Sequence, residues 1–327
     1  MRNIIIGIDI SAKTLDICIK KDKQYEFIKI DNSPVQIKKF LKPYKPLANQ
    51  VYLGMENTGK YNNNLYQVLS QETFTVFVVH PYHLKQSIGL ARGKNDKVDA
   101  ERIVSFVQKN YEELEPWEPS SKSLQNLKVL STERRAMVKT RTRLKQKKKD
   151  YKYISDKSLR KKLERINAKS LKEISAHIRE IEKIIDQTIK ADESLKTKMD
   201  LMQSVPGVGK IVATAILVKT DGFRLYKKPR KLACCAGVVP FNYQSGTSIN
   251  SRSKVSHMAD KSLKTLLNMA ALRAVRMGND LQHYYDRKVA EGKNKMSVLN
   301  AVRNKIIHII YAVIKNQKSF KNRLVLS

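Results

Sequence analysis

Four carboxylate side chains stand where one fold can bring them together. Asp9 follows an apolar run (GIDIS), and Glu56 ends another (LGMENTG). Asp96 and Asp99 open an amphipathic stretch (KNDKVDAE), and their spacing places both on one face of a helix. Carboxylates held this close repel one another unless cations neutralise them, and oxygen ligands of this kind suit Mg²⁺ or Mn²⁺. The set predicts metal-assisted phosphoryl transfer, in which two ions clamp a scissile phosphate.

Each of these acids also has an ordinary structural explanation. Asp9 can be a turn residue, Glu56 can pair with a surface lysine, and Asp96 can cap a helix N-terminus. Because separate coincidences would be needed for all of them, a shared metal site is the favoured interpretation. In that site Lys94 and Lys97, which are interleaved with the helical acids, help to hold phosphate.

The elements that must position these acids occupy the first third of the chain. Apolar β-branched runs predict strands, and helical spacing predicts the helices between them. The predicted strands are residues 3–8, 14–20, 25–30, 51–56 and 73–80, and the predicted helices are 34–41, 59–72 and 96–110. Three antiparallel strands followed by alternating helices and strands is the ribonuclease-H-like order, with the first and fourth strands central and adjacent. Parallel neighbours end at the same sheet edge, so Asp9 and Glu56 are expected there together.

The remainder of the chain has a helical pattern. The proline-bearing segment EPWEPSS (115–121) marks a boundary, and residues 122–200 contain no proline or glycine. Leucine and isoleucine recur there at helical intervals, which predicts two long helices in an antiparallel hairpin or coiled coil. The predicted fold class is therefore α/β plus all-α. Its three parts are residues 1–118, 119–200 and 201–327.

A glycine-rich turn interrupts the apolar helical stretches of residues 201–220. Its sequence, Pro-Gly-x-Gly, resembles a helix-hairpin-helix, where Gly207 and Gly209 let backbone N–H groups approach a phosphate and Lys210 adds charge. A plain tight turn between core helices explains the same residues equally well. Downstream, the pattern predicts a short helix, a serine-rich polar loop, a helix from about residue 260 and a last helix over 296–315.

The charge of the chain is large and unevenly distributed. The chain has 64 Lys and Arg residues against 30 Asp and Glu, a formal net charge of +34. Residues 1–118 hold 17 basic and 14 acidic side chains, whereas 134–169 hold 16 and 3, and 201–327 hold 23 and 5. This distribution indicates chemistry in the first part and nucleic-acid binding behind it, although a charge run is often only a solvated face. The candidate nucleic-acid contacts are Arg141, Arg143, Lys145, Lys147, Lys148, Lys149, Gly207, Gly209, Lys210, Arg252 and Lys254.

The cysteines and the apolar runs argue against a disulfide-bonded, zinc-binding, secreted or membrane protein. Of the three cysteines, Cys234 and Cys235 are adjacent, which is poor disulfide geometry, and no CxxC pair indicates zinc. The apolar run at the N-terminus is too short for a signal peptide, and no window is expected to reach a transmembrane length. A reducing cytoplasm and no membrane are the expectation.

The motifs occur together in one order along the whole chain. GIDIS, MENTG, KNDKVDA, PGVG and AGVVPFNYQSG resemble the DEDD transposases of the insertion-sequence-110 family, which are kin of the Piv-type DNA invertases. The resemblance implies a RuvC-like N-terminal domain and a C-terminal transposase domain. It also implies a recombinase that excises and inserts a mobile element, guided by a structured bridge RNA and assembled as dimers and tetramers.

The resemblance also assigns roles to residues. Asp9, Glu56, Asp96 and Asp99 match the acidic tetrad, and Ser245 of the QSG motif matches a serine that attacks DNA and forms a phosphoserine link. Other serines crowd the same loop, namely Ser248, Ser251, Ser253 and Ser256. Where many members have lysine-glycine-asparagine after the loop, this chain has HMADKSLK, so backbone geometry at Ala259 and Asp260 is expected to differ.

Two other functions fit the residues. One is a magnesium-dependent RuvC-like nuclease, selective for DNA structure, in which water replaces the serine as nucleophile. The other is a nucleic-acid-binding scaffold without chemistry. Retention of DNA cleavage after Ser245→Ala separates the nuclease from the recombinase. Indifference of DNA processing to Asp9→Asn identifies the scaffold.

Overall fold

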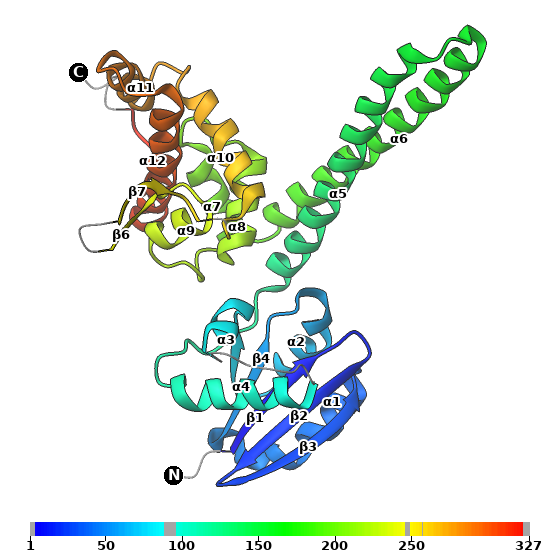
Figure 1. Ribbon diagram of the computed structural model, residues 1–327, viewed down its shortest axis with the longest axis vertical. Helices are drawn as coiled ribbons and strands as arrows, with labels where there is room; N and C mark the ends of the chain where they lie inside the picture. Colours follow the sequence, from blue (N-terminus) through cyan, green and yellow to red (C-terminus); the bar gives the residue numbers. More distant parts are fainter. Residues whose placement is uncertain (1–3, 88–95, 246–248, 257, 323–327) are drawn as a thin grey trace. The chain divides into compact units, whose positions relative to one another are not determined.

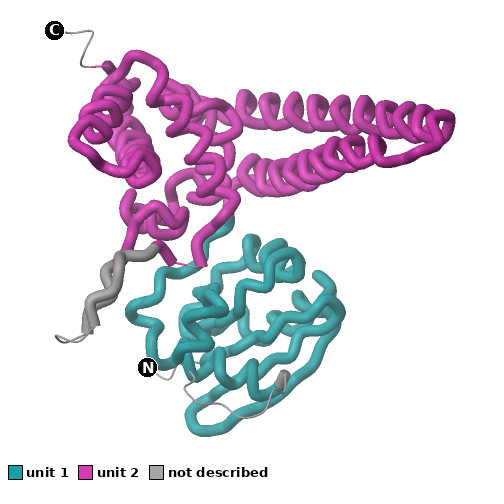
Figure 2. Tube along the Cα trace, turned by 45° about the horizontal axis from the view of Figure 1, so that its top comes forward, with its two compact units in different colours: residues 1–119 teal, residues 120–327 magenta. Residues whose placement is uncertain are grey.

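The computed structural model describes residues 4–87, 96–245, 249–256 and 258–322. The side chains of Asp96, of residues 242–245 and of residues 249–254 lie outside that description. The chain forms two compact units, residues 1–119 and 120–327, which Figure 2 colours separately. Each unit is described by itself.

A five-stranded sheet forms the centre of the first unit (Figure 1). Its strands lie in the order β3-β2-β1-β4-β5, with β1, β2 and β3 antiparallel and β1, β4 and β5 parallel. The predicted adjacency of the first and fourth strands is confirmed, and β1 is the middle strand. The strand bounds are β1 Ile4–Ile10, β2 Thr14–Lys21, β3 Gln24–Asp31, β4 Val51–Glu56 and β5 Thr75–Val79.

Helices cover both faces of this sheet. Because side chains alternate along a strand, Ile6 and Ile8 join one apolar core, whereas Ile5 joins the other. The core around Ile5 also holds Ile103 and Val104 of α4. The helical elements of this unit are α1 Pro34–Leu41, η1 Lys42–Gln50, η2 Gly59–Asn62, α2 Asn63–Leu69, α3 Pro81–Ser87 and α4 Asp96–Asn110.

Two glycines let α4 lie directly on the sheet. Gly7 of β1 and Gly54 of β4 are register partners. A Cβ atom on Gly7 would lie 2.4 Å from the carbonyl oxygen of Ala100, and one on Gly54 would lie 2.6 Å from a methyl carbon of Val107. Real Cβ atoms do not approach other atoms so closely, so only glycine fits at either position. The pair fixes the height of α4 above the two strands.

A long helical hairpin opens the second unit, as the sequence predicts. Helix α5 (Lys122–Asp150) and helix α6 (Lys157–Lys190) are joined by a short turn, η3 (Tyr151–Tyr153). Across the hairpin, Arg134 Nε donates to Glu182 at 2.8 Å, and Asn167 Nδ2 donates to the Leu144 carbonyl at 3.2 Å. The proline- and glycine-free sequence therefore forms two paired helices.

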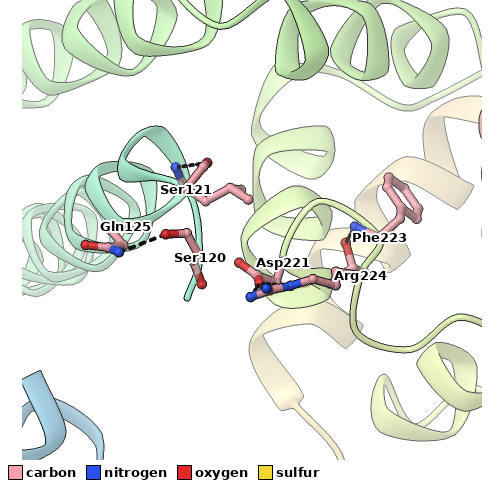
Figure 3. A network of polar contacts seen from close by, with 8 residues as sticks. Ser120, Ser121, Gln125, Asp221, Phe223 and Arg224 are labelled. Carbon is pink, nitrogen blue, oxygen red and sulfur yellow. Dashed lines mark hydrogen bonds and ion pairs between the residues drawn. The ribbon is translucent and has the colours of Figure 1, made fainter. Parts of the chain in front are cut away.

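The base of the hairpin belongs to the core of the second unit. Leu127 of α5 and Ile185 of α6 are buried in the same apolar cluster as residues of the C-terminal helices. Figure 3 shows the first turn of α5, where Gln125 Nε2 donates to the Ser120 carbonyl at 2.8 Å, beside the turn that ends α8. In that turn Asp221 has a positive φ and forms an ion pair with Arg224. These contacts fix the hairpin at its root.

In the part of the second unit that the structure describes, six helices and one β-hairpin follow the α5–α6 hairpin. The helices are α7 Glu193–Gln203, α8 Lys210–Thr220, α9 Pro229–Cys235, α10 Lys261–Ala274, α11 Asp280–Ala290 and α12 Lys295–Asn316. The segment predicted as a serine-rich loop contains two antiparallel strands, β6 Phe241–Ser245 and β7 Ile249–Lys254. Sequence reasoning missed them because their polar residues lack the apolar alternation by which strands are found.

The expectation that no apolar stretch reaches a transmembrane length is wrong for helix α12. Among the described residues it is the one helix long and apolar enough to cross a membrane, with a mean hydropathy of 1.2. Its side chains Val302, Ile306, Ile307 and Ile310 are fully buried within the unit. The apolar composition of α12 is that of a central core helix.

Candidate active site and nucleic-acid interface

Asp9 and Glu56 lie on one face and at one end of the sheet. The register of β1 and β4 pairs Gly7 with Gly54 and Ile8 with Met55, and the two acids are the next residues of the same strands. Each acid comes two residues after a glycine that faces α4, so both side chains project from the α4 face. Neighbouring parallel strands thus place two carboxylates side by side.

Asp16, which the sequence analysis missed, is a third acid on this face. It is the register partner of Asp9 across β1 and β2. Cys18, two residues further on, is buried in the core under α4, so Asp16 faces the same way. Asp16 is buried, and its carboxylate forms an ion pair with Lys29 at 3.2 Å from the opposite position of β3. The sequence feature that could have revealed Asp16 is a single acidic residue within the apolar strand TLDICIK.

Asp99 lies in the first turns of α4, next in sequence to Ala100, whose carbonyl lies against Gly7. Its Oδ1 accepts a hydrogen bond from Arg102 Nη1 at 2.7 Å. Asp96 begins the same helix, and its side chain is outside the described residues. Within the described part of the chain, no three His, Cys, Asp or Glu side chains gather as metal ligands. The oxygen donors are of the type that Mg²⁺ or Mn²⁺ prefers, but Asp99 is held by Arg102 rather than beside Asp9 and Glu56.

The thiol on this face is unsuited to bind a metal. The pKa of Cys18 is raised to about 11, mainly by burial and in addition by Glu101, while Lys20 acts in the opposite direction. The thiol is therefore protonated at neutral pH, whereas metal coordination requires the thiolate. Metal chemistry at this edge of the sheet would depend on carboxylates.

Ser245 ends the first strand of the β6–β7 hairpin. Its backbone pairs with Ile249, which is the last pair before the connection of residues 246–248. The side chain of Ser245 lies outside the described residues, as do those of Arg252 and Lys254 on β7. The register shifts between Phe241 and Tyr243, which indicates an irregularity near the base of the hairpin.

The base of this hairpin is fastened to three helices. Gly237 has a φ of +64°, and a Cβ atom there would lie 2.4 Å from Cβ of Ala259. The Asp260 N–H donates to the Cys235 carbonyl at 2.7 Å, and its carboxylate caps α10 by accepting from the Leu263 N–H at 3.0 Å. Lys219 of α8 forms an ion pair with the same carboxylate at 3.0 Å. Ala259 and Asp260 thus hold the base of the hairpin.

The electrostatics of Asp260 reflect these bonds. Burial raises the pKa of Asp260, but the Leu263 N–H and Lys219 outweigh burial, so the pKa is lowered overall. The same ion pair outweighs burial at Lys219, whose pKa is raised. Both groups are therefore charged at neutral pH, and each stabilises the other.

The two glycines of the PGVG turn have different roles. Gly207 has a φ of +81°, and a Cβ atom there would lie 2.1 Å from the Ala270 carbonyl oxygen of α10. Gly209 precedes α8 with open space around it, and Lys210 forms an ion pair with Asp186 at 2.6 Å. Gly207 therefore serves core packing, and Gly209 leaves the start of α8 accessible.

The basic run lies at the far end of the long hairpin. Arg141 is half-buried, and the other predicted contacts are exposed: Arg143, Lys145, Lys147, Lys148 and Lys149. Tyr153 in the connecting turn is also 76% exposed, and Lys152 lies over its ring. Exposed cations with an exposed aromatic ring can bind nucleic-acid phosphates and bases.

Comparison with known proteins agrees with these features. A family model of DEDD transposases of IS110, described as a transposase, matches residues 6–151. A second, described as "Transposase IS116/IS110/IS902 family", matches residues 199–286. The chain is 26% identical over 99% of both chains to a pilin gene-inverting protein of Moraxella lacunata. It is also 24% identical to the transposase for insertion sequence element IS1111A of Coxiella burnetii, over 42% of this chain and 38% of that one.

The family models and the named relatives identify the chain as a DNA transposase or recombinase. The two family matches together cover more than half of the chain and agree with each other. The chain belongs to the IS110 family of transposases.

Proposed function

We propose that this transposase cuts and rejoins DNA with a divalent-metal site and a serine nucleophile. Asp9, Glu56, Asp96 and Asp99 would hold Mg²⁺ or Mn²⁺, which supplies Lewis-acid stabilisation of the reacting phosphate. The observation that carries the proposal is the placement of Asp9 and Glu56 on neighbouring parallel strands, facing α4. This is the arrangement of a RuvC-like domain, to which we assign the first unit.

Closing such a site requires Asp99 to exchange its partner. Arg102 now donates to the carboxylate of Asp99 at 2.7 Å, and one turn of α4 separates Asp99 from Asp96. We infer that Arg102 holds Asp99 until the site is loaded. Asp16 has Lys29 as its partner, so it adds no net charge to the edge that Asp9 and Glu56 share.

Ser245 would attack a phosphodiester of the DNA backbone. Its Oγ gives up a proton and bonds to phosphorus, while a deoxyribose oxygen leaves and takes a proton. The product is a phosphoserine link that preserves the energy of the broken bond for rejoining. Ser245 lies two residues after Tyr243 in β6, and its pair with Ile249 is the last one between the two strands of the hairpin.

The test compares two substitutions on one DNA substrate. Ser245→Ala is expected to abolish the covalent protein–DNA adduct while leaving divalent-ion binding intact. Asp9→Asn is expected to abolish cleavage and to weaken ion binding. DNA cleavage that survives Ser245→Ala would identify a water-using nuclease instead, and DNA processing that survives Asp9→Asn would identify a binding scaffold. Ser251→Ala is the matched control for the serines of the hairpin.

The basic surfaces would hold the nucleic acids, including a guide RNA. The first unit is nearly neutral, whereas the far end of the α5–α6 hairpin and the C-terminal helices hold most of the excess charge. We propose three functional parts, residues 1–118, 119–200 and 201–327, acting as a dimer or tetramer in the cytoplasm. The three free cysteines are compatible with a reducing compartment. Purification from cells followed by sequencing of bound RNA tests the guide, and absence of any enriched structured RNA contradicts it.

A further inference from the structure

Arg303 of α12 is a buried cation in the second unit. Only 7% of its surface is exposed, although a guanidinium stays charged in proteins. Burial lowers the pKa of Arg303, but the group keeps its proton at neutral pH. A buried charge is costly unless an opposite charge neutralises it.

The partners of Arg303 among the described residues are neutral amides. Nη2 donates to Asn268 Oδ1 of α10 at 2.5 Å, and Nη1 donates to Asn300 Oδ1 at 3.4 Å, near the limit of a hydrogen bond. Nε is buried without an acceptor. The guanidinium has five N–H donors, so most of its capacity is unused.

The stretches of this unit whose side chains lie outside the description carry no acidic side chain. From Gly237 to Ala259 the sequence contains no aspartate or glutamate, and residues 323–327 contain none. Asp260, which follows that stretch, is already used by Lys219 and by the start of α10. No acidic side chain among the described residues neutralises Arg303, so an anion from another molecule can take that role.

The position of Arg303 associates it with the serine hairpin. Asn300, which contacts Arg303, donates from Nδ2 to the Val238 carbonyl at 2.8 Å. Val238 precedes β6 in the segment that Gly237 and Asp260 fasten. One asparagine side chain thus joins the buried cation to the backbone that leads into the hairpin.

We propose that Arg303 is an anchor for a DNA backbone phosphate beside the serine hairpin. A phosphate presents two oxygens to the guanidinium fork, whose paired N–H donors suit such hydrogen bonds. The phosphate supplies the charge that the unit lacks, and the fork fixes the phosphate relative to the segment that carries Ser245. This proposal rests on the proposed DNA recombinase function but does not depend on Ser245 being the nucleophile.

The first experiment uses Arg303→Met in the full-length protein, with Arg303→Lys beside it. Removing an uncompensated buried charge is expected to keep or raise the thermal midpoint of the free protein. The same change should weaken duplex DNA binding and reduce the salt slope by about one unit, the value for one phosphate contact. Arg303→Lys keeps the charge but not the fork, so it should restore the salt slope and only part of the affinity. A lower thermal midpoint together with an unchanged slope would show a purely structural arginine.

The second experiment uses inorganic phosphate as the probe, without DNA. Phosphate is expected to raise the thermal midpoint of the natural protein and to lose this effect in Arg303→Met. Lys315→Met, which removes an exposed charge from the same helix, is the matched control and should keep the full response. An equal response in Arg303→Met and the natural protein would overturn the anchor.

Further measurements distinguish a DNA phosphate from other anions, and the phosphate anchor from the proposed serine mechanism. A loss of salt slope with structured RNA but not with duplex DNA would overturn the DNA assignment. A change of oligomeric state in Arg303→Met with an unchanged DNA slope would point to a carboxylate of a second copy and overturn the phosphate. Ser245→Ala should leave the DNA salt slope and the phosphate response unchanged, so failure of the serine mechanism remains distinguishable from failure of the anchor.

Discussion

Asp9 and Glu56 lie near the ends of strands in a sheet that has apolar cores on both faces, whereas Ser245 ends the first strand of a two-stranded hairpin that joins no other described strand. A two-stranded hairpin has little stability of its own, so its position depends on what holds its base. Metal ligands require placement within a fraction of an ångström, which a buried sheet provides. The two parts that we propose to be reactive therefore depend on different supports: strand register in one unit, and a few anchoring contacts in the other.

The largest expected effect comes from Gly7→Val, which disturbs the packing of α4 on the sheet. The added side chain meets the Ala100 carbonyl, where even a Cβ atom would lie at 2.4 Å, so α4 must move away from β1. We expect the first unit to lose about 3 kcal/mol or more of unfolding free energy, at the upper end for overpacking, and DNA cleavage to disappear. Chemical denaturation followed by circular dichroism measures the change. Val35→Ala, at a position 75% exposed, should change stability by less than about 0.5 kcal/mol.

A smaller loss of unfolding free energy is expected from Gly207→Ala, which disturbs the packing of α10 in the second unit. The residue has a positive φ, and its Cβ would lie 2.1 Å from the Ala270 carbonyl. We expect a loss of about 2 kcal/mol from strain and displacement of α10. Limited proteolysis with unit-specific detection should show the second unit opening while residues 1–119 stay protected. Simultaneous opening of both units would contradict their independence.

The contacts at the hairpin base make a smaller contribution that depends on pH. Asp260→Ala removes a helix cap and the partner of Lys219, with an expected cost of about 1–2 kcal/mol. Because the folded pKa of Asp260 is lowered, its stabilisation is present above the pKa of the unfolded chain and is lost as pH falls through the folded value. The stability difference between Asp260→Ala and the natural protein should therefore shrink in acid. Thermal midpoints measured from neutral to acidic pH test this, and a constant difference would exclude the ionised carboxylate as the cause.

The smallest expected effect on stability comes from Lys147→Ala combined with Lys148→Ala. Both side chains are exposed on α5, so the thermal midpoint should not change. Nucleic-acid binding should weaken, and its salt slope should fall by about one unit for each lost phosphate contact. Lys122→Ala, at the opposite end of α5, is the control. An unchanged slope in the double variant would show that this run is only solvated surface.

Regular elements with strong patterns were predictable from the sequence. Apolar β-branched runs predicted the strands that carry Asp9 and Glu56, and the helical spacing of residues 122–200 predicted α5 and α6. In both cases one local pattern specifies one element, and neighbouring strands follow from chain order.

Features that depend on contacts between distant residues were not predictable. Asp16 reads as an ordinary polar residue until the register places it opposite Asp9. The β6–β7 strands are polar, so their pairing rests on a turn and on anchors at Gly237 and Asp260 rather than on alternation. Arg303 is one of many basic residues in the sequence, and only tertiary burial distinguishes it.

The root of the α5–α6 hairpin sets the reach of the molecule. Leu127 and Ile185 fix that root in the core of the second unit, and α5 continues to residue 150. With a rise of 1.5 Å per residue, the part of α5 from Leu127 to Asp150 extends about 35 Å from the root. One full turn of duplex DNA is about 35 Å long. Under the nucleic-acid-binding role that we propose for the tip, the bound segment would lie about one helical turn of duplex DNA from the root of the hairpin.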